Sequence, residues 1–291
     1  MEKSTKKEKD IYVFFSFDMV GSTKLKTKKE DWPFSISQFY KTVYTELQRE
    51  IRQIKVWKYL GDEILLYVSI RDLGVDFDSR SLSLIKIPKI VYDVQSEVAE
   101  TIQKESPELN VKSTVWIAGI QTIWSYENKL DEHYKNITAT IDMEANNRTE
   151  DKTENRTKKE DDFLGPDMDI GFRVAKFAFH HKVVLSADFA YLLYKISEDK
   201  EDKIDDNLRI VSYEILKGVW DEQYYPIIWY YPHWGTKPYG LFYADHKKHD
   251  IAERVLSGRI DPINKLTQVY DDLGKTAEID AFVAECKTLL A

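Results

Sequence analysis

The chain has 291 residues, which is enough for one large domain or for a medium-sized domain with an extension. Hydrophobic residues make up 43% and charged residues 32%, the balance of a globular protein, and the formal net charge of −8 argues against long-range attraction of DNA or RNA. A single cysteine, Cys286, excludes an intrachain disulfide, and no apolar run approaches the ~18–20 residues of a membrane-spanning helix.

The N-terminal part of the chain is predicted to contain a strand followed by a long helix. Residues 1–10 are polar and are expected to be disordered, and since no apolar region of a secretory signal follows them, a cytoplasmic location is expected. Residues 11–17 predict a buried strand that ends at Asp18, and Gly21 then permits a turn. Apolar residues four apart predict a helix over residues 32–54.

A tight hairpin is predicted after this helix. Residues 55–60 and 64–70 look like two strands that are separated only by the tripeptide Gly-Asp-Glu. Residues 84–104 again show helical spacing, and residues 111–124 predict a further strand. Strands thus alternate with helices over this part of the chain.

Residues 125–161 differ in composition from what precedes them. Apolar residues become scarce and residues 149–161 are nearly all charged or polar, which predicts a flexible charged insertion. Order is expected to return at Phe163, with a helix at 169–179, a strand at 183–186, a helix at 188–196, strands at 211–216 and 227–231, and helices at 242–256, 262–273 and 276–290. We therefore expect an α+β domain over residues 11–240, with helices on one face of the sheet, and a helical extension over residues 241–291.

Two aspartates are predicted to meet at one edge of this sheet. Asp18 ends the first strand and Asp62 lies at the tip of the hairpin, so pairing of the hairpin with the first strand brings the two carboxylates together. Carboxylate oxygens are hard ligands for Mg²⁺ or Mn²⁺, and two such ions can activate a hydroxyl and neutralise a leaving pyrophosphate. Each aspartate also fits a structural role, Asp18 as a helix cap and Asp62 as a turn residue.

Three segments, in this order, resemble the class III nucleotidyl cyclases, the family of adenylyl and guanylyl cyclases. Residues 15–23 (FSFDMVGST) are similar to the first metal motif, residues 58–62 (KYLGD) to the second, and residues 163–173 (FLGPDMDIGFR) to the third segment. The resemblance covers residues 11–231 and implies the ferredoxin-like βααββαβ catalytic domain of that family. It also implies a lyase that converts a nucleoside triphosphate into a cyclic mononucleotide and diphosphate.

The resemblance implies roles for individual residues. Asp18 and Asp62 would hold two divalent metal ions, with the backbone carbonyl of Met19 completing one coordination shell. Arg173 stands where the family has an arginine that reaches the transition-state charge from the partner protomer, which implies a head-to-tail homodimer with composite active sites. Taken without the family, Arg173 fits a solvated helix cation.

The positions that would read the base depart from the purine cyclases. Lys58 and Asp162 stand at the family's base-reading lysine and aspartate positions, which taken alone suggests ATP, while their structural alternatives are an exposed strand lysine and a solvated loop acid. The family's asparagine four residues before the arginine is Asp169 here. Its lysine near the last strands is Val219, so triphosphate binding would fall to another cation such as Lys217.

Tyr59 adds a further departure, because it is bulkier than the residue usual beside the lysine and favours a smaller base. These departures resemble the Pycsar pyrimidine cyclases of bacterial anti-phage defence, in the segments 58–63 (KYLGDE), 169–173 (DIGFR), 216–220 (LKGVW) and 225–230 (YPIIWY). That resemblance implies a uridylate cyclase that makes cUMP from UTP with two Mn²⁺ (or Mg²⁺) ions per site. It also implies a functional link to a cyclic-nucleotide-sensing effector.

Several alternatives remain at this point. A cytidylate cyclase (CTP to cCMP) or an adenylyl or guanylyl cyclase keeps the fold and the metals and changes only the base. A catalytically inactive domain that binds nucleotide or dimerises is favoured by Asp169 and Val219, and the retention of Asp18 and Asp62 speaks against it. The many aromatic residues between 220 and 243 are interpreted as core or interface packing rather than base stacking.

Overall fold

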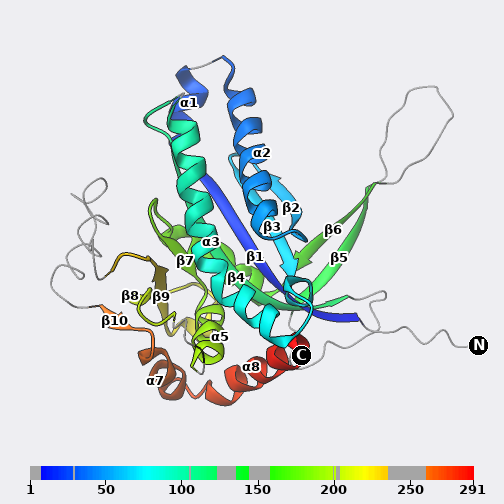
Figure 1. Ribbon diagram of the computed structural model, residues 1–291, viewed down its shortest axis with the longest axis vertical. Coiled ribbons are helices and arrows are strands. Elements are labelled where there is room, and N and C mark those ends of the chain that lie inside the picture. The colour runs from blue at the N-terminus through cyan, green and yellow to red at the C-terminus, as the bar shows by residue number, and fades with distance from the viewer. Residues whose placement is uncertain are drawn as a thin grey trace, which may run out of the picture.

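The computed structural model describes residues 8–28, 30–104, 106–122, 136–143, 158–198, 200, 204–234 and 260–291. Within these ranges the chain folds around one sheet of 10 strands in the order β10-β8-β9-β7-β4-β1-β3-β2, with β5 and β6 branching from β4. Helices pack along the sheet (Figure 1). The predicted α+β class is confirmed.

The first half of the chain has the predicted order of one strand, two helices, a hairpin, a helix and a strand. β1 lies between β3 and β4 and is antiparallel to both, so the four strands follow the order β4-β1-β3-β2 of a ferredoxin-like sheet. The elements are β1 (Glu8–Val20), α1 (Ser22–Lys28), α2 (Trp32–Glu50), β2 (Lys55–Leu60), β3 (Glu63–Ser69), the 3₁₀ helix η1 (Ile70–Leu73), α3 (Phe77–Gln103) and β4 (Asn110–Thr122).

The second half extends the sheet beyond β4 and ends in helices. The helix predicted over residues 242–256 lies outside the described residues. Among the described helices, none combines the length and the apolar character needed to cross a membrane. The elements are β5 (Asn136–Met143), β6 (Lys158–Leu164), α4 (Pro166–Val174), η2 (Ala175–Phe177), β7 (Val183–Leu185), α5 (Ala187–Ser197), β8 (Leu208–Ile215), η3 (Trp220–Glu222), β9 (Tyr224–Tyr230), β10 (Asp261–Pro262), α7 (Lys265–Asp272) and α8 (Thr276–Leu290).

Two segments that we expected to lack structure are strands in part. β1 begins at Glu8 rather than at residue 11, because its first residues pair with the end of β4. The expectation of a flexible insertion is wrong for residues 136–143 and 158–161, which belong to β5 and β6. These two strands pair with each other along their length and so satisfy each other's backbone groups without a run of apolar residues.

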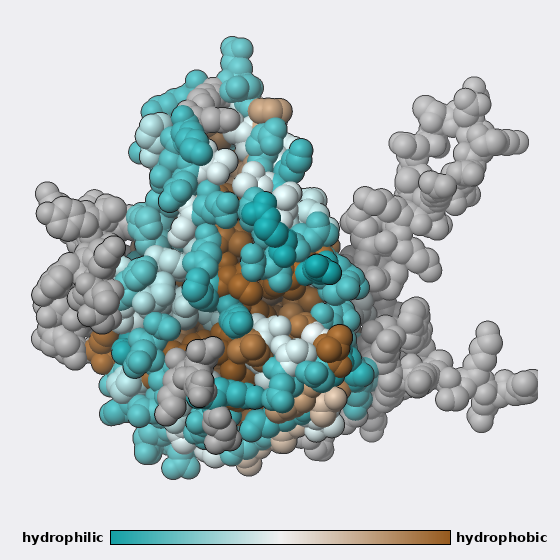
Figure 2. Space-filling model, in the orientation of Figure 1, coloured by the Kyte–Doolittle hydropathy of each residue, from teal (hydrophilic) through white to brown (hydrophobic). Residues whose placement is uncertain are grey.

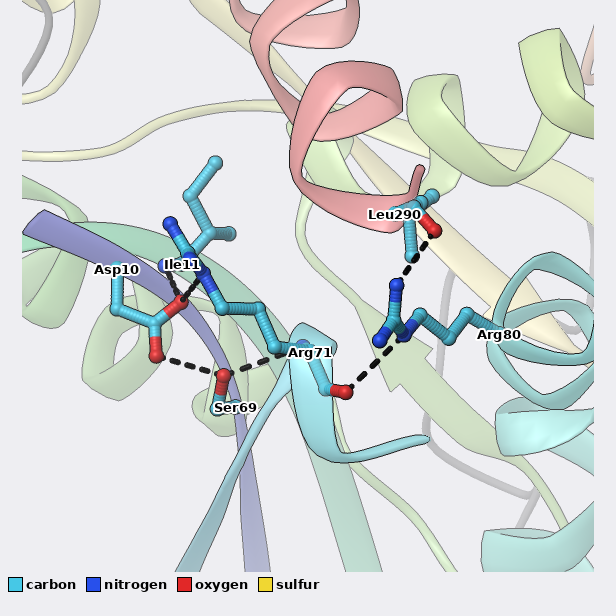
Figure 3. Close-up of polar contacts among 6 residues, drawn as sticks. All are labelled: Asp10, Ile11, Ser69, Arg71, Arg80 and Leu290. Carbon is cyan, nitrogen blue, oxygen red and sulfur yellow. Dashed lines mark hydrogen bonds and ion pairs between the residues drawn. The ribbon is translucent and has the colours of Figure 1, made fainter. Parts of the chain in front are cut away.

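Polar contacts connect the start of β1 and the end of α8 to η1 (Figure 3). Asp10 accepts a hydrogen bond from Ser69 Oγ at 2.6 Å, and its other oxygen lies 3.3 Å from Nε of Arg71. Arg80 of α3 donates to the carbonyl of Leu290 at 3.0 Å and to the carbonyl of Arg71 at 3.1 Å. The last turn of the chain is therefore fixed to the helix layer.

The two faces of the sheet carry different side chains. On one face, alternate residues of β1 pack against the apolar sides of α2 and α3, which lie on the same side of the sheet in Figure 1. The outer surface on this side is mostly hydrophilic, with an apolar area near the centre of Figure 2. The other face carries what we call the aromatic cluster: Phe14, Leu65, Trp116, Ala118, Ile120, Phe163 and Met168, with Tyr12, Trp57 and Tyr67 packed against it.

Gly171 is a point of close approach between α4 and the aromatic cluster. A Cβ atom at this position would lie 2.4 Å from the ring of Trp116, which is only 1% exposed. Alanine in place of a helical glycine normally stabilises a protein by about 0.5–1 kcal/mol. We expect the opposite sign for Gly171→Ala, a loss of about 1–3 kcal/mol in the free energy of unfolding, because the buried indole has to move.

Chemical denaturation measures this effect. In a Trp116→Leu background, where the clash is removed, the same change at Gly171 is expected to be neutral or stabilising. An increase in stability of Gly171→Ala in the original background would contradict the steric explanation.

Candidate active site

The end of β1 and the turn between β2 and β3 meet at one edge of the sheet. The backbone N–H of Met19 donates to the carbonyl of Asp62 at 3.1 Å, and Asp18 pairs with Glu63 in the register of β1 and β3. The structure therefore brings Asp18 and Asp62 to the same place. Because side chains alternate along a strand, Asp18 points to the face that carries Phe14 and the aromatic cluster.

Each of these two carboxylates is paired with a lysine. Nζ of Lys112, on β4, lies 2.8 Å from Oδ2 of Asp18, and Nζ of Lys26, on α1, lies 3.5 Å from Oδ1 of Asp62. The Ser22 hydroxyl donates to Oδ2 of Asp62. The Asp18 and Asp62 side chains are 27% and 29% exposed, so both can be reached from solvent. Neither lysine was predicted from the sequence, although the β1–β4 register places Lys112 opposite Asp18.

Burial affects the ionisation of the carboxylates at this edge. It raises the pKa of Asp18, against the hydrogen bond and charge of Lys112, and the nearby charge of Asp62 raises it further. Burial also raises the pKa of Glu63, whose Oε1 accepts a hydrogen bond from Ser16 Oγ at 2.5 Å. Added positive charge beside Asp18 would therefore favour its ionised form.

The donor set at this edge fits a hard divalent cation. The described residues contain no group of three or more His, Cys, Asp or Glu side chains that could hold a metal ion, so the side-chain donors here are the two aspartates. Mg²⁺ and Mn²⁺ suit such a site, because Mg²⁺ in particular binds through one or two carboxylates and completes its shell with water and substrate phosphates. Met19 is 2% exposed and packs in the core, so only its backbone could serve as a donor at this edge.

Lys58 and Asp162, the two predicted base-reading residues, also come together. Nζ of Lys58, on β2, lies 2.6 Å from Oδ1 of Asp162, on β6. Asp162 is therefore a strand residue with a fixed partner rather than a solvated loop acid. Trp57, which sequence reasoning missed, donates from Nε1 to the same Oδ1 atom at 3.0 Å.

Tyr59 is placed apart from this pair. Its ring lies 4.6 Å from the ring of Tyr40 on α2, and its side chain is 55% exposed. The Tyr40 hydroxyl donates to the carbonyl of Gly61 at 2.6 Å, so the two tyrosines lie beside the turn that carries Asp62. Within one protomer, Tyr59 packs toward α2 rather than against Lys58 and Asp162.

The remaining predicted residues lie on and near α4. Arg173 is in its last turn, next to Gly218, and its Nε atom is buried without a hydrogen-bond partner in the described part of the chain. Asp169 is exposed in the first turn of α4, and Lys217 is exposed between β8 and η3. Among the described residues, no hydrogen bond or ion pair joins these three to Asp18 or Asp62.

The aromatic residues from 220 to 234 mainly fill the core. Tyr225 and Trp229 are 1% and 2% exposed, and Trp229 Nε1 donates to the carbonyl of Phe177 at 3.2 Å. Trp220 packs on Tyr225 and on Tyr270 of α7, with ring centroids 4.6 and 5.4 Å away. Packing accounts for these side chains without a base-stacking role.

The chain is similar to known proteins in structure rather than in sequence. No family model matches the sequence, and no curated protein matches it significantly. Similar solved structures include the adenylyl cyclase CyaB from P. aeruginosa (TM-score 0.49, 8% identity, 77% of this chain and 95% of that chain covered) and the guanylyl cyclase Cya2 (TM-score 0.47, 12% identity, 77% and 92% covered). The catalytic core of a rhodopsin-guanylyl cyclase with converted specificity, in complex with ATPαS, is also similar (TM-score 0.48, 11% identity, 77% and 98% covered).

Proposed function

We propose that this chain is a nucleotidyl cyclase that converts UTP into cUMP and diphosphate by attack of the 3′-hydroxyl on the α-phosphate. The observation that carries the proposal is the convergence of Asp18 and Asp62 at one edge of the sheet, joined by the backbone hydrogen bond from Met19 to Asp62. Two partly exposed carboxylates in this position suit two-metal chemistry. The resemblance of residues 15–23, 58–62 and 163–173 to class III cyclase motifs supports the same activity.

In this proposal Asp18, Asp62 and the Met19 carbonyl hold two Mn²⁺ or Mg²⁺ ions. When bound, such ions make the 3′-hydroxyl more acidic and neutralise charge on the diphosphate. The protein contributes position: the short turn between β2 and β3 fixes Asp62 against the end of β1, and Ser22 holds one of its oxygens. Lys26 and Lys112 balance the carboxylates and have to release them when the cations bind.

The competition between Lys112 and a cation leads to a testable expectation. In Lys112→Met the ammonium group 2.8 Å from Asp18 is removed, so the carboxylate is no longer occupied by an internal partner. We expect Mn²⁺ to bind about two- to fivefold more tightly, in line with the strength of a partly exposed ion pair. Electron paramagnetic resonance of Mn²⁺ titrations measures this. Weaker Mn²⁺ binding by Lys112→Met would place Lys112 among the groups that support the site.

The proposed site needs two protomers. Among the described residues, no hydrogen bond or ion pair joins Arg173, Asp169 or Lys217 to Asp18 or Asp62, whereas phosphoryl transfer needs a cation on the transition-state charge. A head-to-tail homodimer, in which Arg173 of the partner subunit faces the metal carboxylates, supplies this cation. Arg173 is partly exposed, and its Nε is buried without a hydrogen-bond partner among the described residues.

The choice of a pyrimidine rests on the base-reading pair and on the departures from purine cyclases. Lys58 and Asp162 offer a donor and an acceptor side by side, and the resemblance to Pycsar cyclases favours UTP, with CTP as the alternative. In that role cUMP is the second messenger of an anti-phage defence system in the cytoplasm, read by a cyclic-nucleotide-sensing effector.

Incubation with ATP, GTP, CTP and UTP, each with Mn²⁺, tests the proposal. We expect cUMP to be the dominant product. Dominant cCMP would change the substrate within the pyrimidines, and dominant cAMP or cGMP would end the pyrimidine assignment. The absence of any cyclic product would favour an inactive nucleotide-binding domain, a reading that Val219 supports because it is 3% exposed and replaces a phosphate-binding lysine.

A further inference from the structure

An irregularity in β2 places two neighbouring side chains on the same face of the sheet. The pairing of β2 with β3 shifts between Val56, opposite Leu66, and Lys58, opposite Leu65. Trp57 is therefore the extra residue of a β-bulge. In a regular strand, Trp57 and Lys58 would point to opposite faces. With the bulge, both reach Asp162, on the face that carries the aromatic cluster.

The indole of Trp57 contacts both members of the Lys58–Asp162 pair. Its Nε1 donates to Oδ1 of Asp162 at 3.0 Å, and the ammonium group of Lys58 lies 4.3 Å from the centre of the indole ring. The ring is held in turn by Phe14 and Phe163, with centroids 5.6 and 5.3 Å away. One side chain thus ties the lysine and the aspartate to a rigid part of the sheet.

The hydrogen bonds to Asp162 are unequal between its two oxygens. Oδ1 accepts from Trp57 Nε1, from Lys58 Nζ at 2.6 Å and from the backbone N–H of Phe163 at 3.0 Å. Within the described ranges, every hydrogen bond to this carboxylate falls on Oδ1. These bonds to Oδ1 fix the orientation of the carboxylate, so Oδ2 can accept a hydrogen bond from one direction. The Asp162 side chain is 27% exposed, so a ligand can reach it.

We propose that Trp57 is a positioning residue for base selection, which holds Asp162 and Lys58 at a fixed separation so that Oδ2 and the ammonium group read one nucleobase edge. This inference rests on the proposed function of the site. Uracil presents an N–H between two carbonyl groups, whereas cytosine and adenine present an amino group beside a bare ring nitrogen. A mobile acid–lysine pair adjusts to either pattern, and a fixed pair discriminates between them.

The substitution that tests this role removes only the indole N–H. In Trp57→Phe the ring contacts with Phe14 and Phe163 are largely retained, but Oδ1 of Asp162 loses one donor. We expect the ratio of kcat/KM between the preferred nucleotide and the next best to fall about tenfold, mainly through KM. Benzothienylalanine at position 57, which has the size of tryptophan and no N–H, is expected to give the same result if the phenylalanine variant folds poorly.

A double-mutant cycle separates positioning from packing. If Trp57 acts through Asp162, the variant Trp57→Phe/Asp162→Asn discriminates no less than Asp162→Asn alone. Tyr67→Phe is the matched control, because the Tyr67 ring packs on the same Phe14 and Phe163, while the described hydrogen bonds to the Asp162 carboxylate come from Trp57, Lys58 and Phe163. It is expected to leave the ratio unchanged.

Two further outcomes keep this inference distinct from the proposed function. An unchanged ratio in Trp57→Phe, or equal losses for all nucleotides, would overturn the positioning role while leaving the cyclase intact. If the unmodified protein makes no cyclic product, the proposed function fails. The base preference is then measured by calorimetry with α,β-methylene analogues of the four nucleotides, and an identical preference in the two proteins overturns the role of Trp57.

Discussion

Alanine in place of Asp62 is expected to abolish cyclic nucleotide formation, with a loss of at least about 10³-fold in kcat/KM. Removal of a carboxylate that holds metal ions takes away several kcal/mol of transition-state stabilisation, and each 1.4 kcal/mol corresponds to about tenfold in rate. The oligomeric state is expected to be unchanged, because the Asp62 side chain lies in the turn between β2 and β3 and is partly exposed. Product formation is followed by chromatography, and the oligomeric state by light scattering.

The matched control for this change is Asp78→Ala. Asp78 is also an exposed aspartate with a lysine partner, Lys200 at 2.7 Å, and it lies in the first turn of α3. We expect it to retain activity. Normal cyclisation by Asp62→Ala would contradict the assignment of the site, and an equal loss in both variants would point to a general effect on folding.

The position of this site could be predicted from sequence because it depends on local rules. An apolar run that ends at Asp18 and two short strands around Gly61 and Asp62 specify a central strand and a hairpin. Once these pair, the register decides that the two acids meet, and the observed pairing of Asp18 with Glu63 agrees. Metal ligation and the arginine contribution remain predictions, since they depend on an ion and on a second protomer.

Other features could not be predicted because tertiary packing decides them. Regular alternation along β2 would place Trp57 and Lys58 on opposite faces, whereas the packing of the Trp57 ring among the aromatic residues favours the observed bulge. The pairing of Lys112 with Asp18 follows from the register of two strands that are far apart in sequence. The β5–β6 hairpin was missed because its residues are polar and its strands are stabilised mainly by each other.

Alanine in place of Arg173 is expected to lower kcat about 10²- to 10³-fold with little change in nucleotide binding. An arginine that meets charge only in the transition state contributes to the rate and not to ground-state affinity. The surrounding structure is expected to tolerate the change, because Nε of Arg173 has no hydrogen-bond partner among the described residues. The substitution therefore breaks no hydrogen bond at this atom. Lys176→Ala, a neighbouring cation just after α4, is the control and is expected to remain active.

Mixing the two inactive variants tests whether the site is composite. In a heterodimer of Asp62→Ala with Arg173→Ala, one of the two sites combines both changes and the other contains neither. With random exchange of subunits, half of the dimers are mixed, so about a quarter of the original activity should return. This recovery requires Asp62 and Arg173 to act from different protomers, as the proposed head-to-tail arrangement implies. If the mixture stays inactive although subunits exchange, Arg173 serves the Asp62 of its own chain and the head-to-tail arrangement is excluded.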